Sequence, residues 1–84
     1  MLGFLTDPVR CPAYYRHYKG SVYLTVHIAE HTESGQKMVV YASTSGPQRV
    51  WVRPLDMFLE SVMLEGGTSV PRFEFVRWAS LQDC

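Results

Sequence analysis

An alternation of apolar and polar residues over positions 21–28 constrains the fold of this chain more than any other feature. The aliphatic positions are Val22, Leu24, Val26 and Ile28. A period of two is typical of a strand with one buried face. We therefore expect an extended segment over residues 21–33, a turn at Ser34-Gly35 and a return strand over residues 37–42.

The middle of the chain predicts a third strand and one helical turn. Residues 50–53 favour a strand that ends at Pro54, because proline has no N–H to donate to a β-ladder. The next apolar residues are spaced as on one face of a short helix, and they are Leu55, Phe58, Leu59 and Val62. Since proline is favoured at the first helical position, we expect a helical turn near Pro54–Phe58.

Two further extended segments complete the fold prediction. Residues 61–65 lead into a turn at Gly66-Gly67, and residues 73–78 form the last strand. Short strands at these intervals favour a sandwich or a barrel over alternating strands and helices. The expected fold class is therefore mostly β, a small SH3-like barrel of five to six short antiparallel strands with one short helical turn near Pro54–Phe58.

A chain of 84 residues is long enough for one domain and no more. We expect a partly ordered N-terminal leader over residues 1–12, the barrel domain over residues 13–79 and a C-terminal tail over residues 80–84. Hydrophobic residues make up 46% of the chain and aromatic residues 13%, which is the composition of a folded protein and not of a disordered one.

Charge and hydropathy restrict the expected partners. Eight basic residues balance eight acidic ones, so bulk charge does not favour binding to nucleic acid or to an anionic membrane. Six of the eight basic residues are arginines, which suit bidentate recognition of carboxylate or phosphate but also cover apolar edges. The sequence shows no membrane span and no charged signal-peptide region, so we expect a cytoplasmic protein that does not contact a membrane.

Several short motifs occur in a specific order and spacing. They are Y-R-H-Y-K-G at residues 15–20, W-V-R-P-L-D-M-F at residues 51–58 and P-R-F at residues 71–73. Through these motifs the chain resembles a small bacterial family known as domain of unknown function 1653, over a stretch from about Tyr15 to Val76. The resemblance implies an SH3-type barrel. It implies no activity, because the family is defined by sequence alone.

The histidines and cysteines do not predict a metal site. His27 and His31 are four positions apart, and on a strand that spacing is about 13 Å, at roughly 3.3 Å per residue. Two imidazoles so far apart cannot share one zinc ion. Cys11 and Cys84 stand outside any C-x-x-C spacing, and whether they pair stays open. No cofactor is expected.

Strand parity predicts a binding surface. Tyr23, His31 and Glu33 fall on one side of the first strand if it runs without a bulge, and Trp51 and Arg53 share one side of the third. Aromatic walls beside cations can hold an anionic small molecule or a peptide-like partner. The candidate ligand-binding residues are Tyr23, His31, Glu33, Trp51, Arg53 and Arg72. A structural network, with Glu33 paired to Arg53 or Arg72, is an equally weighted alternative.

Two other functions are weaker hypotheses. Tyr15, Arg16, His17 and Lys19 mix rings and cations as a base-stacking platform does. Together with Arg53 and Arg77, they suggest a module for single-stranded RNA or another nucleic acid, which the zero net charge disfavours.

An enzyme is the least favoured reading. It would use His31 and Glu33 as an acid–base pair, and no nucleophile motif supports it. Exposed edge strands could also pair two copies, so a homodimer is a further expectation.

Overall fold

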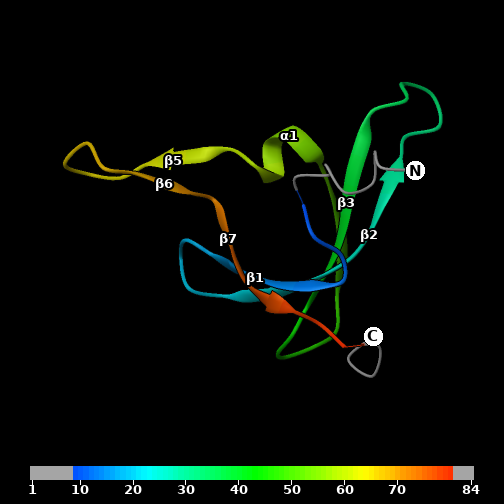
Figure 1. Cartoon of the computed structure of the whole chain (residues 1–84), viewed down its shortest axis with the longest axis horizontal. Helices are drawn as coiled ribbons and strands as arrows, with labels where there is room; N and C mark the ends of the chain where they lie inside the picture. The colour runs from blue at the N-terminus through cyan, green and yellow to red at the C-terminus, as the bar shows by residue number, and fades with distance from the viewer. Residues whose placement is uncertain (1–8, 81–84) are drawn as a thin grey trace.

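The computed structural model describes residues 9–80 of the chain (Figure 1). The predicted leader is therefore described only over residues 9–12, and the predicted tail only at residue 80. Cys84 lies outside the described residues, so the structure does not test whether it pairs with Cys11. Within residues 9–80, no helix is long and apolar enough to cross a membrane.

Seven strands and one short helix follow one another along the described chain. They are β1 (Ala13–His17), β2 (Val22–Glu30), β3 (Lys37–Ser43), β4 (Val50–Pro54), α1 (Leu55–Phe58), β5 (Ser61–Met63), β6 (Ser69–Pro71) and β7 (Phe73–Trp78). The mostly-β class and the helical turn near Pro54–Phe58 are confirmed. The strands number seven where five to six were expected, because residues 13–17 form β1 and the return from the Gly66-Gly67 turn forms β6.

The strands form two antiparallel sheets. The main sheet has five strands in the order β4-β3-β2-β1-β7, and β5 pairs with β6 in a separate hairpin. Figure 1 shows this hairpin extending away from the main sheet. Between residues 9 and 80, β4 and β7 remain as edges, so the pairing does not close a barrel, although the arrangement is compatible with an SH3-like fold.

The two glycines in the β5–β6 turn take a backbone conformation that other residues rarely adopt. Gly66 and Gly67 have φ angles of 93° and 87°. The N–H of Leu64 donates to the carbonyl oxygen of Thr68 at 2.7 Å, which closes the turn. The Gly-Gly pair therefore fixes where the chain reverses, because a side chain at either position would be strained.

A bulge in β2 interrupts the strict alternation read from the sequence. The pairing of β2 with β3 shifts between Thr25 and His27, and the strand ends at Glu30 rather than continuing to residue 33. Before the bulge, Tyr23 and Thr25 face the core, while Val26 is 41% exposed. After the bulge, Ile28 packs against the core. An extra residue in one strand reverses side-chain parity beyond it, which alternation alone cannot reveal.

The core is built around one pair of stacked rings. Phe58 from α1 and Phe73 from β7 lie face to face, with ring centroids 4.1 Å apart and parallel planes. Tyr15 and Tyr41 meet Phe58 edge-on, at 5.3 Å and 5.7 Å. The short helix thus places Phe58 over the inner face of the main sheet, where it is only 1% exposed.

A buried threonine ties the chain before β1 to the sheet. Thr25 is 0% exposed, and its hydroxyl donates to the carbonyl oxygen of Arg10 at 2.7 Å. The same hydroxyl accepts a hydrogen bond from the N–H of Ala13 at 3.0 Å. One buried hydroxyl therefore satisfies two backbone groups that would otherwise lose water without gaining a partner.

Replacing Phe58 by alanine is expected to lower the free energy of unfolding by about 3–5 kcal/mol, because a buried ring and its stacking partner are lost together. Urea denaturation measures the change. Phe58→Leu should lose less, and Met57→Ala, at a residue that is 44% exposed, should change the stability by no more than about 0.5 kcal/mol. Equal effects at positions 57 and 58 would contradict the assignment of the core.

Thr25→Val should destabilise the chain by about 1–3 kcal/mol although valine has nearly the same shape. The reason is that the N–H of Ala13 and the carbonyl oxygen of Arg10 would be left without their partner. Thr25→Ser keeps the hydroxyl and should retain most of this stability. If Thr25→Val is as stable as Thr25→Ser, the hydroxyl contributes no more than the methyl group does, and the expected role of its hydrogen bonds is contradicted.

Candidate functional site

Four aromatic rings lie together on the inner face of the main sheet. Tyr41 and Trp51 are register partners on β3 and β4, and their ring centroids are 5.6 Å apart. Tyr23 on β2 meets Trp51 at 5.7 Å and Phe73 at 5.9 Å, both edge-on. Trp51 is 36% exposed. We call Tyr23, Tyr41, Trp51 and Phe73 the aromatic face.

Two arginines lie against the aromatic face. The Arg53 guanidinium stands 5.8 Å from the centre of the Phe73 ring, and its Nε–H donates to the Tyr41 hydroxyl at 3.4 Å. Arg72 donates from Nη2 to Oε1 of Glu60 at 3.3 Å. Its Nε is buried and has no hydrogen-bond partner in the described part of the chain. Both side chains are half-buried, so water screens their charges less than at an open surface.

His17 adds a third basic group at the same place. Its ring lies 5.0 Å from Phe73 and 6.5 Å from Tyr23. The backbone N–H of Lys19 donates to Nδ1 at 3.2 Å, so in the neutral ring the proton sits on Nε2. Desolvation is the largest cause that lowers the pKa of His17 below its ordinary value of 6.5. The charges of Arg72, Lys19 and Arg53, in that order, lower this pKa further.

A small pocket adjoins the aromatic face beside the loop between β3 and β4. Its volume is about 230 Å³, and Tyr23, Trp51 and Arg49 are among the residues that line it. The loop is held by its own side chains, since Ser43 Oγ accepts from the N–H of Arg49 at 2.9 Å. Thr44 Oγ1 donates to the carbonyl oxygen of Val22 at 2.7 Å. The pocket walls are therefore fixed to the sheet.

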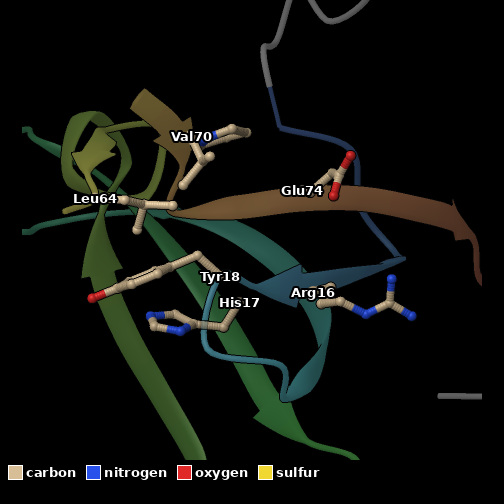
Figure 2. A pocket seen from close by; sticks show the side chains of 7 residues that line it. Arg16, His17, Tyr18, Leu64, Val70 and Glu74 are labelled. Carbon is tan, nitrogen blue, oxygen red and sulfur yellow. The ribbon is translucent and has the colours of Figure 1, made fainter. Parts of the chain in front are cut away.

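Two other pockets differ in charge from the aromatic face. Figure 2 shows one of about 300 Å³, where Leu64 and Val70 of the hairpin lie above the rings of Tyr18 and His17. Its far end carries one cation and one anion, Arg16 and Glu74, which point away from each other (Figure 2). A pocket of about 490 Å³ on the outer face of the sheet is lined by no charged side chain. Neither pocket gathers charge of one sign.

Four of the six residues predicted for ligand binding come together, and two do not. Tyr23, Trp51, Arg53 and Arg72 all lie at the aromatic face or beside it. His31 and Glu33 lie beyond the end of β2, exposed in the turn to β3. His31 Nδ1 accepts from the N–H groups of Glu33 and Ser34, at 3.2 Å and 3.3 Å. This histidine therefore stabilises the turn, and Arg72 pairs with Glu60 and not with Glu33.

The residues of the nucleic-acid hypothesis are divided between the core and two surfaces. Tyr15 is 4% exposed, and its hydroxyl accepts from the N–H of Arg10. Arg16 is exposed at the pocket of Figure 2, whereas Arg77 stacks on Tyr14, 4.3 Å from the ring centre. His17 and Lys19 lie near Arg53 and Arg72. Among residues 9–80, no group of three or more His, Cys, Asp and Glu side chains could hold a metal ion.

Comparison with known proteins identifies the family of this chain. A family model described as "Protein of unknown function (DUF1653)" matches residues 13–75. Among solved structures, the crystal structure of a DUF1653 protein from Bordetella bronchiseptica is similar, with 32% sequence identity and a TM-score of 0.74. The match covers 87% of this chain and 94% of that one. A comparison with curated proteins finds no match.

The lowered pKa of His17 predicts a pH-dependent stability. The unfolded chain takes up this proton at a higher pH than the folded chain does, so protonation favours unfolding. Stability should therefore fall as the pH decreases from about 6.5 towards the pKa of the folded state. His17→Asn keeps an acceptor for the Lys19 N–H but does not titrate, so its urea-denaturation curves should change less over this window.

Proposed function

Because the chain belongs to the DUF1653 family, whose description assigns no function, we propose from its own site that it is a non-catalytic binding module for an anionic small molecule or a peptide-like partner. The ligand would lie on the aromatic face, with its anionic group against Arg53, Arg72 and His17. Tyr23 and Trp51 would contact its uncharged part.

The convergence of three basic side chains on one apolar surface is the observation that carries this proposal. Within residues 9–80, Glu60 is the one carboxylate that pairs with either arginine, and Arg72 keeps a buried Nε without a partner. The pKa of His17 responds to three cations, which indicates a positive potential at this point of the surface. An anion placed there would relieve the repulsion between these basic groups.

The aromatic surroundings would strengthen such an interaction. Charge-assisted hydrogen bonds are stronger where water is excluded, and Arg53 is already oriented by the Phe73 ring and the Tyr41 hydroxyl. Because these contacts hold the guanidinium in place before a ligand arrives, less side-chain freedom is lost on binding. A carboxylate or a phosphate would fit the planar fork of arginine.

The proposal is tested with two simple anions, inorganic phosphate and N-acetylglycine, which carries the carboxylate of a peptide C-terminus. In ¹H–¹⁵N NMR titrations of the wild-type chain, saturable shifts should concentrate at His17, Arg53 and Arg72. Arg53→Gln and Arg72→Gln should each weaken the binding about tenfold or more, since a hydrogen bond to a charged group contributes roughly 1.5–3 kcal/mol.

Arg77→Gln is the matched control, because this arginine stacks on Tyr14 outside the aromatic face. It should bind both anions as the wild-type chain does. Thermal unfolding of each variant checks that the fold is kept. Shifts spread evenly over the surface, or no saturable shift with either anion, would count against the proposed site.

A further inference from the structure

Strand β4 is a regular and exposed edge of the main sheet. Its pairing with β3 runs without a shift in register over residues 50–54. Val50 and Val52 are 60% and 61% exposed. The other edge strand, β7, carries an extra residue at Val76, where its pairing with β1 shifts, and such a bulge turns an edge away from further pairing. Of the two edges of the described sheet, β4 is therefore the one suited to accept another strand.

The backbone groups of Val50 and Val52 point away from β3. The N–H of Ser43 donates to the carbonyl oxygen of Arg49 at 2.9 Å, which marks these two residues as a hydrogen-bonded pair. In an antiparallel ladder such pairs alternate with pairs that exchange no hydrogen bonds. Counted from Arg49, both valines fall in pairs of the second kind, so their N–H and C=O groups face the open edge. Outside the ladder, no backbone hydrogen bond within residues 9–80 uses these groups.

The two faces of β4 differ in charge. On the inner face, Arg53 donates to the Tyr41 hydroxyl, and Arg49, which precedes β4 by one position, lines the same pocket as Trp51. Among the residues that the structure describes, no carboxylate forms an ion pair with Arg49 or Arg53. On the outer face, Val50 lines the pocket of about 490 Å³, which has no charged side chain in its wall.

We infer that the open edge of β4 accepts an extended segment of a partner protein in which acidic and apolar residues alternate. The segment would add a strand to the main sheet through backbone hydrogen bonds to Val50 and Val52. Its acidic side chains would lie beside Arg49 and Arg53, and its apolar side chains beside the two valines, because cross-strand neighbours share a face. This inference rests on the proposed function and names the chemistry of its peptide-like partner.

Charge on β4 selects against a second copy of the chain at this edge. Two copies that pair over residues 49–53 about a twofold axis at Trp51 would place Arg49 opposite the partner's Arg53. Like charges directly opposite each other on a sheet are destabilising. Acidic side chains at the same positions would form pairs of opposite charge, so the edge is complementary to an acidic strand and not to itself.

The probe is a blocked peptide in which glutamate and valine alternate, acetyl-EVEVEVE-amide, because it has no terminal carboxylate. In ¹H–¹⁵N NMR titrations of the full chain it should bind saturably. A peptide with lysine in place of glutamate, and one with the same composition in two blocks, should bind at least tenfold more weakly. With the alternating peptide bound, hydrogen exchange at the amides of Val50 and Val52 should slow at least tenfold.

Variants of the chain test the edge and its charge separately. Val52→Pro removes an N–H that faces the edge and none that pairs with β3, so it should keep the fold and weaken the peptide at least tenfold. Val52→Thr keeps the N–H, and its affinity should stay within about threefold of the wild type. Arg49→Gln should weaken the peptide about two- to fivefold, as expected for one cross-strand charge pair.

Arg16→Gln is the matched control for Arg49→Gln, because β1 is separated from β4 by two strands, and it should leave the affinity unchanged. Thermal unfolding of each variant checks that the fold is kept.

Methylation of alternate peptide nitrogens tests the backbone pairing without changing the protein. Only every second N–H of an added strand faces β4. Methylating one set of nitrogens, those of valine or those of glutamate, should therefore abolish binding, and methylating the other set should be tolerated. Equal effects of the two sets would overturn the inference, and this result does not depend on whether Val52→Pro folds.

The outcomes also separate this inference from the proposed function. If inorganic phosphate and N-acetylglycine bind through Arg53 while the alternating peptide does not bind, the inference is wrong and the anion site stands. If the peptide binds with protection of Val50 and Val52 while neither anion binds, the edge pairing stands and the small-anion site fails. If neither the anions nor the peptide bind, both fail together.

Two further results would count against pairing at β4 itself. If the peptide binds without protecting the amides of Val50 and Val52, it lies elsewhere on the protein and the inference is overturned. If the chain sediments as a dimer that Val52→Pro dissociates, a second copy occupies the edge, and the inference is overturned in the same way.

Discussion

The stacked contact between Phe58 and Phe73 is the interaction on which the rest of the structure depends. Phe58 comes from a helix of one turn, and Phe73 begins the last strand, so this contact joins two ends of a chain segment that otherwise leaves the main sheet. Phe73 also belongs to the aromatic face, where Arg53 lies over its ring. The same side chain therefore holds the core together and orients a charged group of the proposed site.

Much of the fold could be predicted from local patterns in the sequence. Alternation over residues 21–28 indicated the long strand, Gly66-Gly67 indicated a tight turn, and Pro54 with the apolar spacing after it indicated the short helix. The bulge after Thr25 could not be predicted, because it depends on how β3 pairs with β2 and not on any residue type. The strand also ended at Glu30, so His31 and Glu33 lie in the turn to β3.

The candidate site was predictable only where its residues share a strand. Trp51 and Arg53 lie two positions apart, so their common face follows from parity alone. The contributions of Tyr41 and Phe73 depend on the strand order β4-β3-β2-β1-β7, which places residues from distant parts of the sequence side by side. No local pattern encodes that order. Arg49, which lines the pocket beside Trp51, was not among the predicted residues because it precedes the strand predicted over residues 50–53.

Contacts at the base of the β5–β6 hairpin should allow changes at its turn. The N–H of Arg72 donates to the carbonyl oxygen of Glu60 at 2.9 Å, and the two side chains form an ion pair, so the chain that leaves at Glu60 is fastened where it returns. Residues 61–71 therefore form a loop that is closed at its base, and the length of this loop does not determine the position of Arg72. The exposed Gly66-Gly67 turn is thus a point where a peptide or a reporter could be grafted onto the protein.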